Sequence, residues 1–232
     1  AHYSQVHLVP KPSNEPVDSK DVCIPRKWRT TIDYRKFNKC ITTQHWPLPN
    51  IHSMIQRIGK AKPKYFAKLD MTSGYWQAPL AENTKRFTAF ITFMGIFEWN
   101  RAPMGTQPAG GYFHQCIAFI VLAGLIYAIL ESYIDDILVH AKTKKEFWTN
   151  LALVFKRFRK HRITFNPDKV FLSDSSIEFV GHEITSDGIR FSSSKLSGVE
   201  NIPLPATKGD LKKFLGLANY FRDHVKNHSI LS

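Results

Sequence analysis

The stretch ILESYIDDILVH, residues 129–140, contains two short apolar runs separated by two adjacent aspartates. Each run has the length and β-branched content of a strand, so the stretch predicts a β-hairpin with Asp135 and Asp136 at its tip. At least one of these carboxylates then lies near a core that rejects unpaired charge. A divalent cation is an economical compensation, because Mg²⁺ prefers oxygen ligands and is commonly held by one or two carboxylates.

A second strand-end acid precedes this hairpin in the sequence. Asp70 ends the strand-like run Tyr65–Leu69 and is followed closely by Ser73-Gly74. Asp70, Asp135 and Asp136 together would hold two metal ions that activate an attacking 3′ hydroxyl and stabilise a leaving pyrophosphate. The alternative is structural, because aspartates are common in turns and at helix caps. The carboxylate positions alone leave both interpretations open.

The rest of the chain alternates between strand and helix patterns, which predicts an α+β fold. Near the C-terminus, Thr207 and Asp210 have the spacing of a helix cap. Strands are expected at Val6–Val9, Trp28–Asp33, Tyr65–Asp70, Phe87–Ile91, Ile96–Trp99, Ile129–Ile134, Ile137–His140, Ile163–Phe165, Ile177–Val180 and Ile189–Phe191, and helices at Ile51–Ile58, Ala109–Leu125, Thr143–His161 and from Thr207 onward.

Composition narrows the class of partner. Lys and Arg number 32 against 19 Asp and Glu, a net charge of +13, which favours a polyanion. Lys-rich helix faces on an ordinary soluble protein are the alternative. The longest apolar stretch, Cys116–Leu130, is too short for a membrane span. Three separated cysteines indicate no disulfide framework, so an intracellular setting is expected.

Several ordered motifs resemble the reverse transcriptases of retroelements, and most closely the gypsy class of LTR retrotransposons. The resemblance covers nearly the whole chain, and the ordered set is far more specific than any single motif. The matching segments are Trp28-Arg29, Asp33–Asn38, Leu69–Gln77, Tyr133–Val139, Phe179–His182 and Phe214–Tyr220.

This resemblance implies a right-hand polymerase with fingers, a ferredoxin-like palm and a partial helical thumb. The fingers would comprise residues 1–62 and 79–102, the palm residues 63–78, with the first catalytic motif, and 103–202, and the start of the thumb residues 203–232. The implied activity is RNA-directed DNA synthesis from deoxynucleoside triphosphates on an RNA or DNA template with a primer. Two Mg²⁺ ions would serve it, with Mn²⁺ as the alternative ion.

The resemblance also assigns roles at the catalytic centre. Asp70 and Asp135 would be direct metal ligands, Asp136 would complete the triad, and the Met71 carbonyl would add a ligand. Tyr75 would exclude a ribose 2′ hydroxyl. The remaining nucleotide-binding residues would be Arg29 on the triphosphate, the amides of Ser73 and Gly74, and Lys169 as a proton donor to pyrophosphate.

Template and primer contacts are implied outside the catalytic centre. Asp33, Arg35 and Gly105 would lie along the template. The primer end would be held by Val180, Gly181 and His182. On the last helix, Lys212, Gly216 and Tyr220 would face the duplex. For the individual side chains, core packing or a solvated surface is the alternative interpretation.

The sequence also departs from the family pattern. The segment between Lys11 and Trp28 is long, so Lys20 and Arg26 receive no assigned role, and Gly110 stands where a proline is usual. The chain stops early in the thumb, so no RNA-strand cleavage is expected, and a partner or missing C-terminal region would complete the thumb. His224 and His228 lie four residues apart, but a solvated helix face is favoured over a zinc site.

Two rival functions follow from these features. An RNA-dependent RNA polymerase would share the acids, but Tyr133, where glycine is usual, and Tyr75 argue against it. The other rival is a catalytically silent nucleic-acid-binding or assembly protein derived from a retroelement. The intact acids count against that rival, because loss of catalysis would relax the need for charges that are costly to bury.

Overall fold

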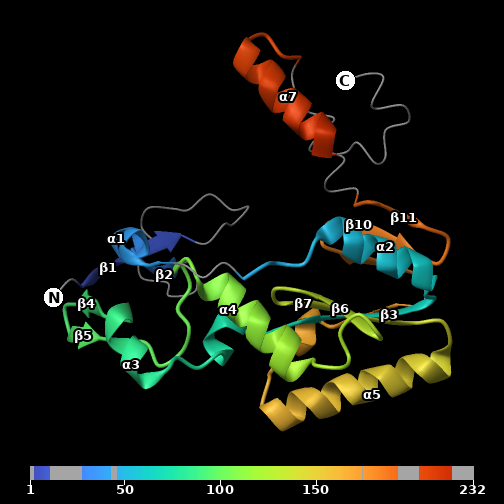
Figure 1. Cartoon of the computed structure of the whole chain (residues 1–232), viewed down its shortest axis with the longest axis horizontal. Helices are drawn as coiled ribbons and strands as arrows, with labels where there is room; N and C mark the ends of the chain where they lie inside the picture. The colour runs from blue at the N-terminus through green and yellow to red at the C-terminus, as the bar shows by residue number, and fades with distance from the viewer. Residues whose placement is uncertain (1–2, 11–27, 43–45, 174, 193–203, 221–232) are drawn as a thin grey trace.

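The computed structural model describes residues 3–10, 28–42, 46–173, 175–192 and 204–220. The side chains of Arg29 and Tyr220 are outside this description, as are Lys20, Arg26, His224 and His228. Helices and strands alternate along the chain (Figure 1), which confirms the predicted α+β class. No helix in the described part is both long and apolar enough to cross a membrane.

A four-stranded antiparallel sheet in the order β6-β7-β3-β8 forms the centre of the molecule. The predicted acidic hairpin is present as two strands, and β3 has the predicted bounds, whereas the sequence did not predict the short edge strand β8. The strands of this central sheet are β3 (Tyr65–Asp70), β6 (Leu130–Tyr133), β7 (Asp136–Ala141) and β8 (Phe171–Ser173).

Helices cover one face of the central sheet. Two elements do so: α4 (Ala109–Gln115) with its π-helical continuation Cys116–Val121, and α5 (Lys144–His161). Alternate strand residues face them, as expected for a period of two. The buried cluster between sheet and helices includes Leu69, Ile137, Val139, Phe113 and Phe158.

The opposite face is covered by α2 (Ile51–Ala61) and a second sheet in the order β11-β10-β9 (Figure 1). Phe66 and Leu138 of the central sheet pack there, in a cluster with Met54 of α2. The strands of this second sheet are β9 (Ser176–Phe179), β10 (His182–Thr185) and β11 (Ile189–Phe191). The central sheet is therefore packed on both faces, although Phe171 and Leu172 of its edge strand β8 are exposed. Asp70 and Asp136, at the strand ends, are only partly buried.

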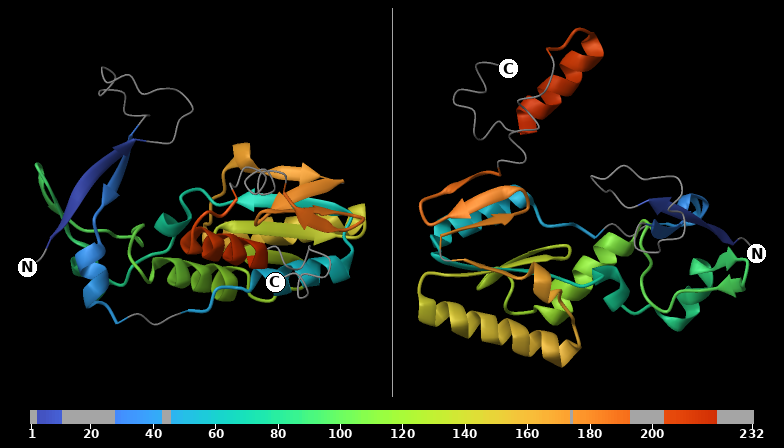
Figure 2. Two further views of the ribbon diagram at one scale, coloured as in Figure 1. Left: turned by 90° about the horizontal axis from the view of Figure 1, so that it is seen from above. Right: turned by 180° about the vertical axis from the view of Figure 1, so that it is seen from behind.

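A third sheet, in the order β2-β1-β4-β5, lies at the N-terminal end of the molecule (Figure 2). Three short helical segments accompany it, and β1 pairs with β2 antiparallel and with β4 parallel. Its elements are β1 (Ser4–Pro10), β2 (Trp28–Ile32), β4 (Phe90–Thr92), β5 (Gly95–Phe97), α1 (Arg35–Cys40), α3 (Glu82–Lys85) and the 3₁₀ turn Arg86–Thr88.

The helix α7 (Lys208–Tyr220) is drawn apart from the three sheets (Figure 1). Its predicted cap is present, because the Asp210 amide donates to Thr207 Oγ1 at 3.1 Å and the Thr207 amide donates to Asp210 Oδ2 at 3.2 Å. The apolar side chains Leu211, Phe214 and Leu215 are exposed.

Three sequence predictions are wrong. The helix expected at Ala109–Leu125 is α-helical only as far as Gln115 and ends, as a π-helix, at Val121. Residues 163–165 form no strand, and only Phe165 bridges to Met71. The first hairpin strand begins at Phe90 instead of Phe87, because Thr88 ends a 3₁₀ turn. The Thr88 hydroxyl donates to the Lys85 carbonyl at 2.7 Å and accepts the Trp99 amide at 3.0 Å, which fixes that turn.

Candidate active site

The three predicted acids meet where β3 ends and β7 begins. Asp70 and Asp136 lie directly opposite one another in the β3–β7 register. Asp135 belongs to the two-residue turn between β6 and β7, and its carbonyl accepts the Met71 amide at 3.4 Å. The preceding residue, Ile134, has a φ of 57°, which is unfavourable for a β-branched side chain. The fold therefore brings the acids together at a strained turn.

Two lysines lie against this acidic group. Lys169 Nζ is 3.4 Å from both oxygens of Asp70, and Lys68 Nζ is 3.5 Å from Asp136 Oδ1. Burial raises the pKa of Asp136, Lys68 opposes that rise, and the neighbouring Asp135 adds to it. Lys68 was missed in the sequence, although it lies two residues before Asp70 and so on the same face of β3.

The donor chemistry here suits a hard divalent cation, because carboxylates that repel one another and are partly desolvated gain most from such an ion. Among the described residues, however, no three His, Cys, Asp or Glu side chains are grouped closely enough to hold a metal ion. Binding an ion would require Asp70, Asp135 and Asp136 to turn toward a common point, with displacement of the lysines.

Ser73 and Gly74 form a tight turn beside the acids. Ser73 has a φ of 49°, and Gly74 is buried. A Cβ atom at Gly74 would lie 2.9 Å from Cζ of Phe113 and 3.4 Å from Cβ of Asp135. Glycine is therefore required for this close approach. The contact with Phe113 could not be predicted from the sequence, because the two residues are 39 positions apart.

Tyr75 follows in a 3₁₀ turn, Gly74–Gln77, and packs against Phe113 with ring centroids 5.3 Å apart. Burial raises the pKa of the Tyr75 hydroxyl, and Asp135 raises it further. The hydroxyl lies 3.6 Å from where a Cβ of Gly110 would be. Gly110, the departure from the family pattern, therefore borders Tyr75.

Gln77 holds the strand-end loop in place and was not predicted as a site residue. Its Nε2 donates to the carbonyls of Thr72 and Thr164 at 2.7 and 2.8 Å, and its Oε1 accepts the Thr164 amide at 2.8 Å. The Gln77 side chain thus takes up the Thr164 amide, and the segment is left with a single bridge, Phe165 to Met71, in place of a full strand pairing. That explains the missing strand.

The predicted template residues lie together in a shallow cavity of about 540 Å³ that Asp33, Arg35 and Gly105 help to line. Arg35 donates to both oxygens of Asp33, with the shortest contact at 2.7 Å, and this hydrogen bonding lowers the pKa of Asp33. Asn38 Nδ2 donates to the Gly105 carbonyl at 2.9 Å, and Gly105 has a φ of 91°.

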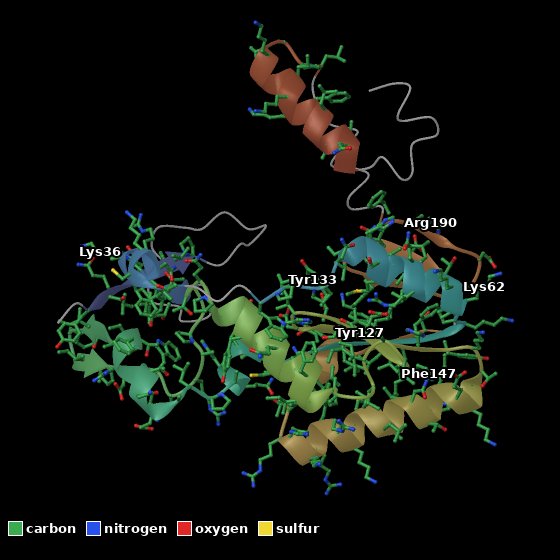
Figure 3. The ribbon with its side chains drawn as sticks, viewed as in Figure 1. Lys36, Lys62, Tyr127, Tyr133, Phe147 and Arg190 are labelled. Carbon is green, nitrogen blue, oxygen red and sulfur yellow. The ribbon has the colours of Figure 1, made fainter. Side chains whose placement is uncertain are left out.

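The predicted primer residues form a turn between β9 and β10. Val180 and Gly181 both have positive φ, 48° and 72°, which allows the two-residue connection. The ring of His182 is buried, and its Nδ1 lies 3.1 Å from the Val180 carbonyl. Val180 packs against the same apolar cluster as Tyr133, which Figure 3 labels, so this turn neighbours the acidic hairpin.

The remaining predicted residues are not brought to the acids by any described contact. Arg29 pairs through its backbone with Val9 in the N-terminal sheet. Lys212 and Gly216 are exposed on α7, and nothing lies within 4 Å of a Cβ built at Gly216. Tyr220 is the last residue of that helix.

An antiparallel sheet backed by helices, with aspartates at the ends of two adjacent strands, defines the palm of a nucleic-acid polymerase. Residues 9–184 match the family described as reverse transcriptase (RNA-dependent DNA polymerase), and the chain belongs to that family. This confirms the class indicated by the motifs and argues against an RNA-dependent RNA polymerase.

Curated relatives include retrovirus-related Pol polyproteins from Drosophila melanogaster transposons. The opus polyprotein is 32% identical over 227 residues, covering 94% of this chain and 22% of the relative. The gypsy polyprotein is 27% identical over 231 residues, covering 96% and 22%. The chain thus spans about a fifth of the length of these relatives.

Solved structures of a foamy viral protease-reverse transcriptase have the same fold. The complex with dsDNA has a TM-score of 0.77 and 25% identity, covering 98% of this chain and 44% of that chain. The complex with an RNA/DNA hybrid has a TM-score of 0.69 and 24% identity, covering 95% and 27%, and supports the fold alone. The predicted right-hand polymerase fold is confirmed.

Proposed function

We propose that this chain performs RNA-directed DNA synthesis, adding deoxynucleotides to the 3′ end of a primer. The observation that carries the proposal is the meeting of Asp70, Asp135 and Asp136 at adjacent strand ends within a reverse transcriptase fold. The direction of the Asp136 pKa shift supports a cation-dependent site, because burial and like charge leave this carboxylate undercompensated.

Two Mg²⁺ ions, or Mn²⁺, would be held by Asp70, Asp135, Asp136 and the carbonyl of Met71. When bound, such ions lower the pKa of the attacking hydroxyl and stabilise charge on the transferred phosphate. Lys169 lies on the Asp70 side of the acids, where its ammonium group can donate a proton to the leaving pyrophosphate.

The nucleotide would lie over the turn that follows β3. The amides of Ser73 and Gly74 would contact its triphosphate, with the Arg29 guanidinium, and the ring of Tyr75 would occupy the space of a 2′ hydroxyl. Phe113 supports this gate, because its packing against Tyr75 limits how far the ring can withdraw.

An RNA or DNA template with its primer would be the macromolecular partner, as in the foamy viral complexes with an RNA/DNA hybrid and with dsDNA. The cavity that holds Asp33, Arg35 and Gly105 would contact the template, and the turn at Val180, Gly181 and His182 would contact the primer. Lys212, Gly216 and Tyr220 on α7 would face the duplex.

The expected division into fingers, palm and thumb is part of the same proposal. Residues 1–62 and 79–102 would be fingers, 63–78 and 103–202 palm, and 203–232 the start of the thumb. The exposed apolar side chains of α7 support completion of the thumb by a partner or by a further part of the polyprotein.

Primer extension tests the proposal. The purified chain is given a DNA primer on an RNA template with deoxynucleotides and Mg²⁺, beside Asp135→Asn and the control Asp187→Asn, which makes the same change in an exposed turn. We expect extension by the parent and the control and a loss of at least about a hundredfold in Asp135→Asn. Equal activity of Asp135→Asn and the parent would overturn the assignment.

A further inference from the structure

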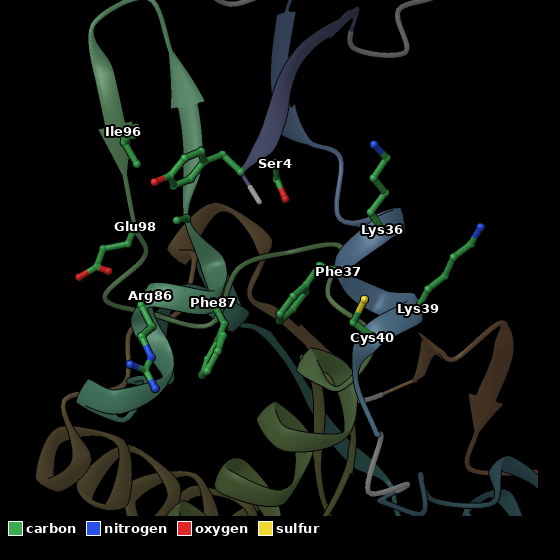
Figure 4. Close-up of a pocket in the computed structure, with 11 residues that line it drawn as sticks. Ser4, Lys36, Phe37, Lys39, Cys40, Arg86, Phe87, Ile96 and Glu98 are labelled. Atoms are coloured by element: carbon green, nitrogen blue, oxygen red, sulfur yellow. The ribbon is translucent and has the colours of Figure 1, made fainter. Parts of the chain in front are cut away.

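We propose that a groove in the N-terminal part of the molecule binds single-stranded nucleic acid, with bases on its aromatic floor and phosphates on its cationic rim. The groove has a volume of about 890 Å³ and lies between β1, α1, the turn Arg86–Thr88 and β5 (Figure 4). It contains none of the residues assigned above to metal, nucleotide, template or primer. The proposal therefore rests on the chemistry of the groove and not on the catalytic assignment.

The floor of the groove is aromatic. Phe37 and Phe87 come from different elements, and both also line an adjoining cavity of about 600 Å³. None of the described residues that line this second cavity carries a charge. Phe87 is 55% exposed, so part of its ring is open to solvent. A flat, uncharged, aromatic group therefore has a surface to stack on and an apolar space to enter.

The rim of the groove is cationic. Lys36, Lys39 and Arg86 are exposed, and none of them forms an ion pair with another described residue. Figure 4 shows the two lysine side chains extending away from the Phe37 ring toward the outside. The Arg86 guanidinium lies 4.9 Å from the centre of the Phe87 ring. Glu98 is the one acid among the residues that line the groove.

An aromatic floor beneath a cationic rim suits a polyanion that carries flat aromatic groups and does not hold them in a duplex stack. Single-stranded nucleic acid has this chemistry, since each base offers a flat face and each linkage a negative charge. A duplex satisfies the rim but keeps its bases away from the floor. An apolar small molecule satisfies the floor but supplies no negative charge to the three rim cations, which have no counter-charge among the described residues. The aromatic floor and the cationic rim together therefore favour single-stranded nucleic acid.

Fluorescence anisotropy tests this directly. The probe is a labelled oligothymidylate of about 12 nucleotides, and a blunt DNA duplex serves for comparison. Phe87→Ala is paired with Phe93→Ala, an equally drastic truncation of a fully exposed ring on the β4–β5 turn. Lys36→Ala/Lys39→Ala is paired with Lys156→Ala/Lys160→Ala, which removes the same charge from the exposed side of α5.

We expect Phe87→Ala and the Lys36/Lys39 variant to weaken oligothymidylate binding by about fivefold or more, and Phe87→Ala to change duplex binding by less than twofold or so. The two control variants and Asp135→Asn should bind like the parent. Retained oligothymidylate binding in Phe87→Ala would overturn the proposal. Equal losses of binding in the Lys36/Lys39 and Lys156/Lys160 variants would also overturn it, because they would indicate a general attraction to a basic protein. Sedimentation velocity adds a further check, because a dimer of the parent that Phe87→Ala abolishes would mean that a second copy covers the groove.

Discussion

A single methyl group decides whether the turn after β3 can form. At Gly74 an added Cβ would lie 2.9 Å from the ring of Phe113, which is buried, and 3.4 Å from Cβ of Asp135. We expect Gly74→Ala to lower the free energy of unfolding by about 1–3 kcal/mol and to reduce primer extension strongly. Urea denaturation measures the first effect. Gly188→Ala, where a Cβ meets open space, should change neither.

Tyr75 also acts as a single residue, because its ring alone is proposed to distinguish ribose from deoxyribose. Truncation in Tyr75→Ala should raise the incorporation of ribonucleotides relative to deoxynucleotides by about tenfold or more, with deoxynucleotide incorporation as the internal reference. Single-nucleotide extension with each triphosphate gives the ratio. An unchanged ratio would remove the gate from the mechanism and leave Tyr75 as a packing residue on Phe113.

Asp136 links the site to the pH dependence of stability. Its folded-state pKa lies above the ordinary value of 3.8, mainly because the carboxyl is partly buried. Between pH 3.8, the ordinary pKa, and the higher pKa of the folded state, the folded state binds more protons than the unfolded state. The free energy of unfolding therefore falls as the pH rises through that window and stays reduced above it. Without divalent ions, Asp136→Asn should therefore raise the Tm at neutral pH. Asp187→Asn is the control, and a lower Tm in Asp136→Asn would contradict the argument.

At the scale of elements, an ion pair fastens α2 to the central sheet. Arg57 donates to both oxygens of Glu131 on β6 at 2.7 and 2.8 Å, and Glu131 is 1% exposed. Removing the arginine leaves a buried carboxylate without compensation, so Arg57→Ala should cost about 3 kcal/mol in urea denaturation. The control is Arg190→Ala in the exposed pair with Glu183, where less than about 1 kcal/mol is expected. Similar losses of stability in Arg57→Ala and Arg190→Ala would show that burial does not make the Arg57–Glu131 pair more important than an exposed pair.

The elements also differ in how well the sequence predicts them. The helix α5 was predicted because its apolar residues recur at helical spacing and Thr143 caps it, accepting the Glu146 amide. The helix α1 was missed because its six residues carry no such periodicity and its position depends on Asn38, which bonds to Gly105 and Gln107 far along the chain. Local patterns predict long elements, whereas short ones depend on distant partners.

For the whole molecule, net charge governs how it meets a polyanion. A charge of +13 implies that several phosphates are neutralised on binding, and each releases condensed counterions. The logarithm of the affinity for a blunt DNA duplex should therefore fall with the logarithm of salt concentration, with a slope of about −4 or steeper. Anisotropy titrations across salt concentrations measure the slope. A slope near zero would mean that these cations do not face the nucleic acid.

The sequence by itself determined the acidic hairpin, the strand that ends at Asp70 and the family, because each depends on neighbouring residues and on the order of short motifs. Only the tertiary structure decided that Lys68 lies against Asp136, that Phe113 lies too close to Gly74 for a Cβ atom, and that Phe37 and Phe87 line one groove. The physical reason is that these contacts join segments far apart in the chain, whose meeting depends on the packing of whole elements. The carboxylates could thus be found by reading along the chain, but their surroundings required the fold.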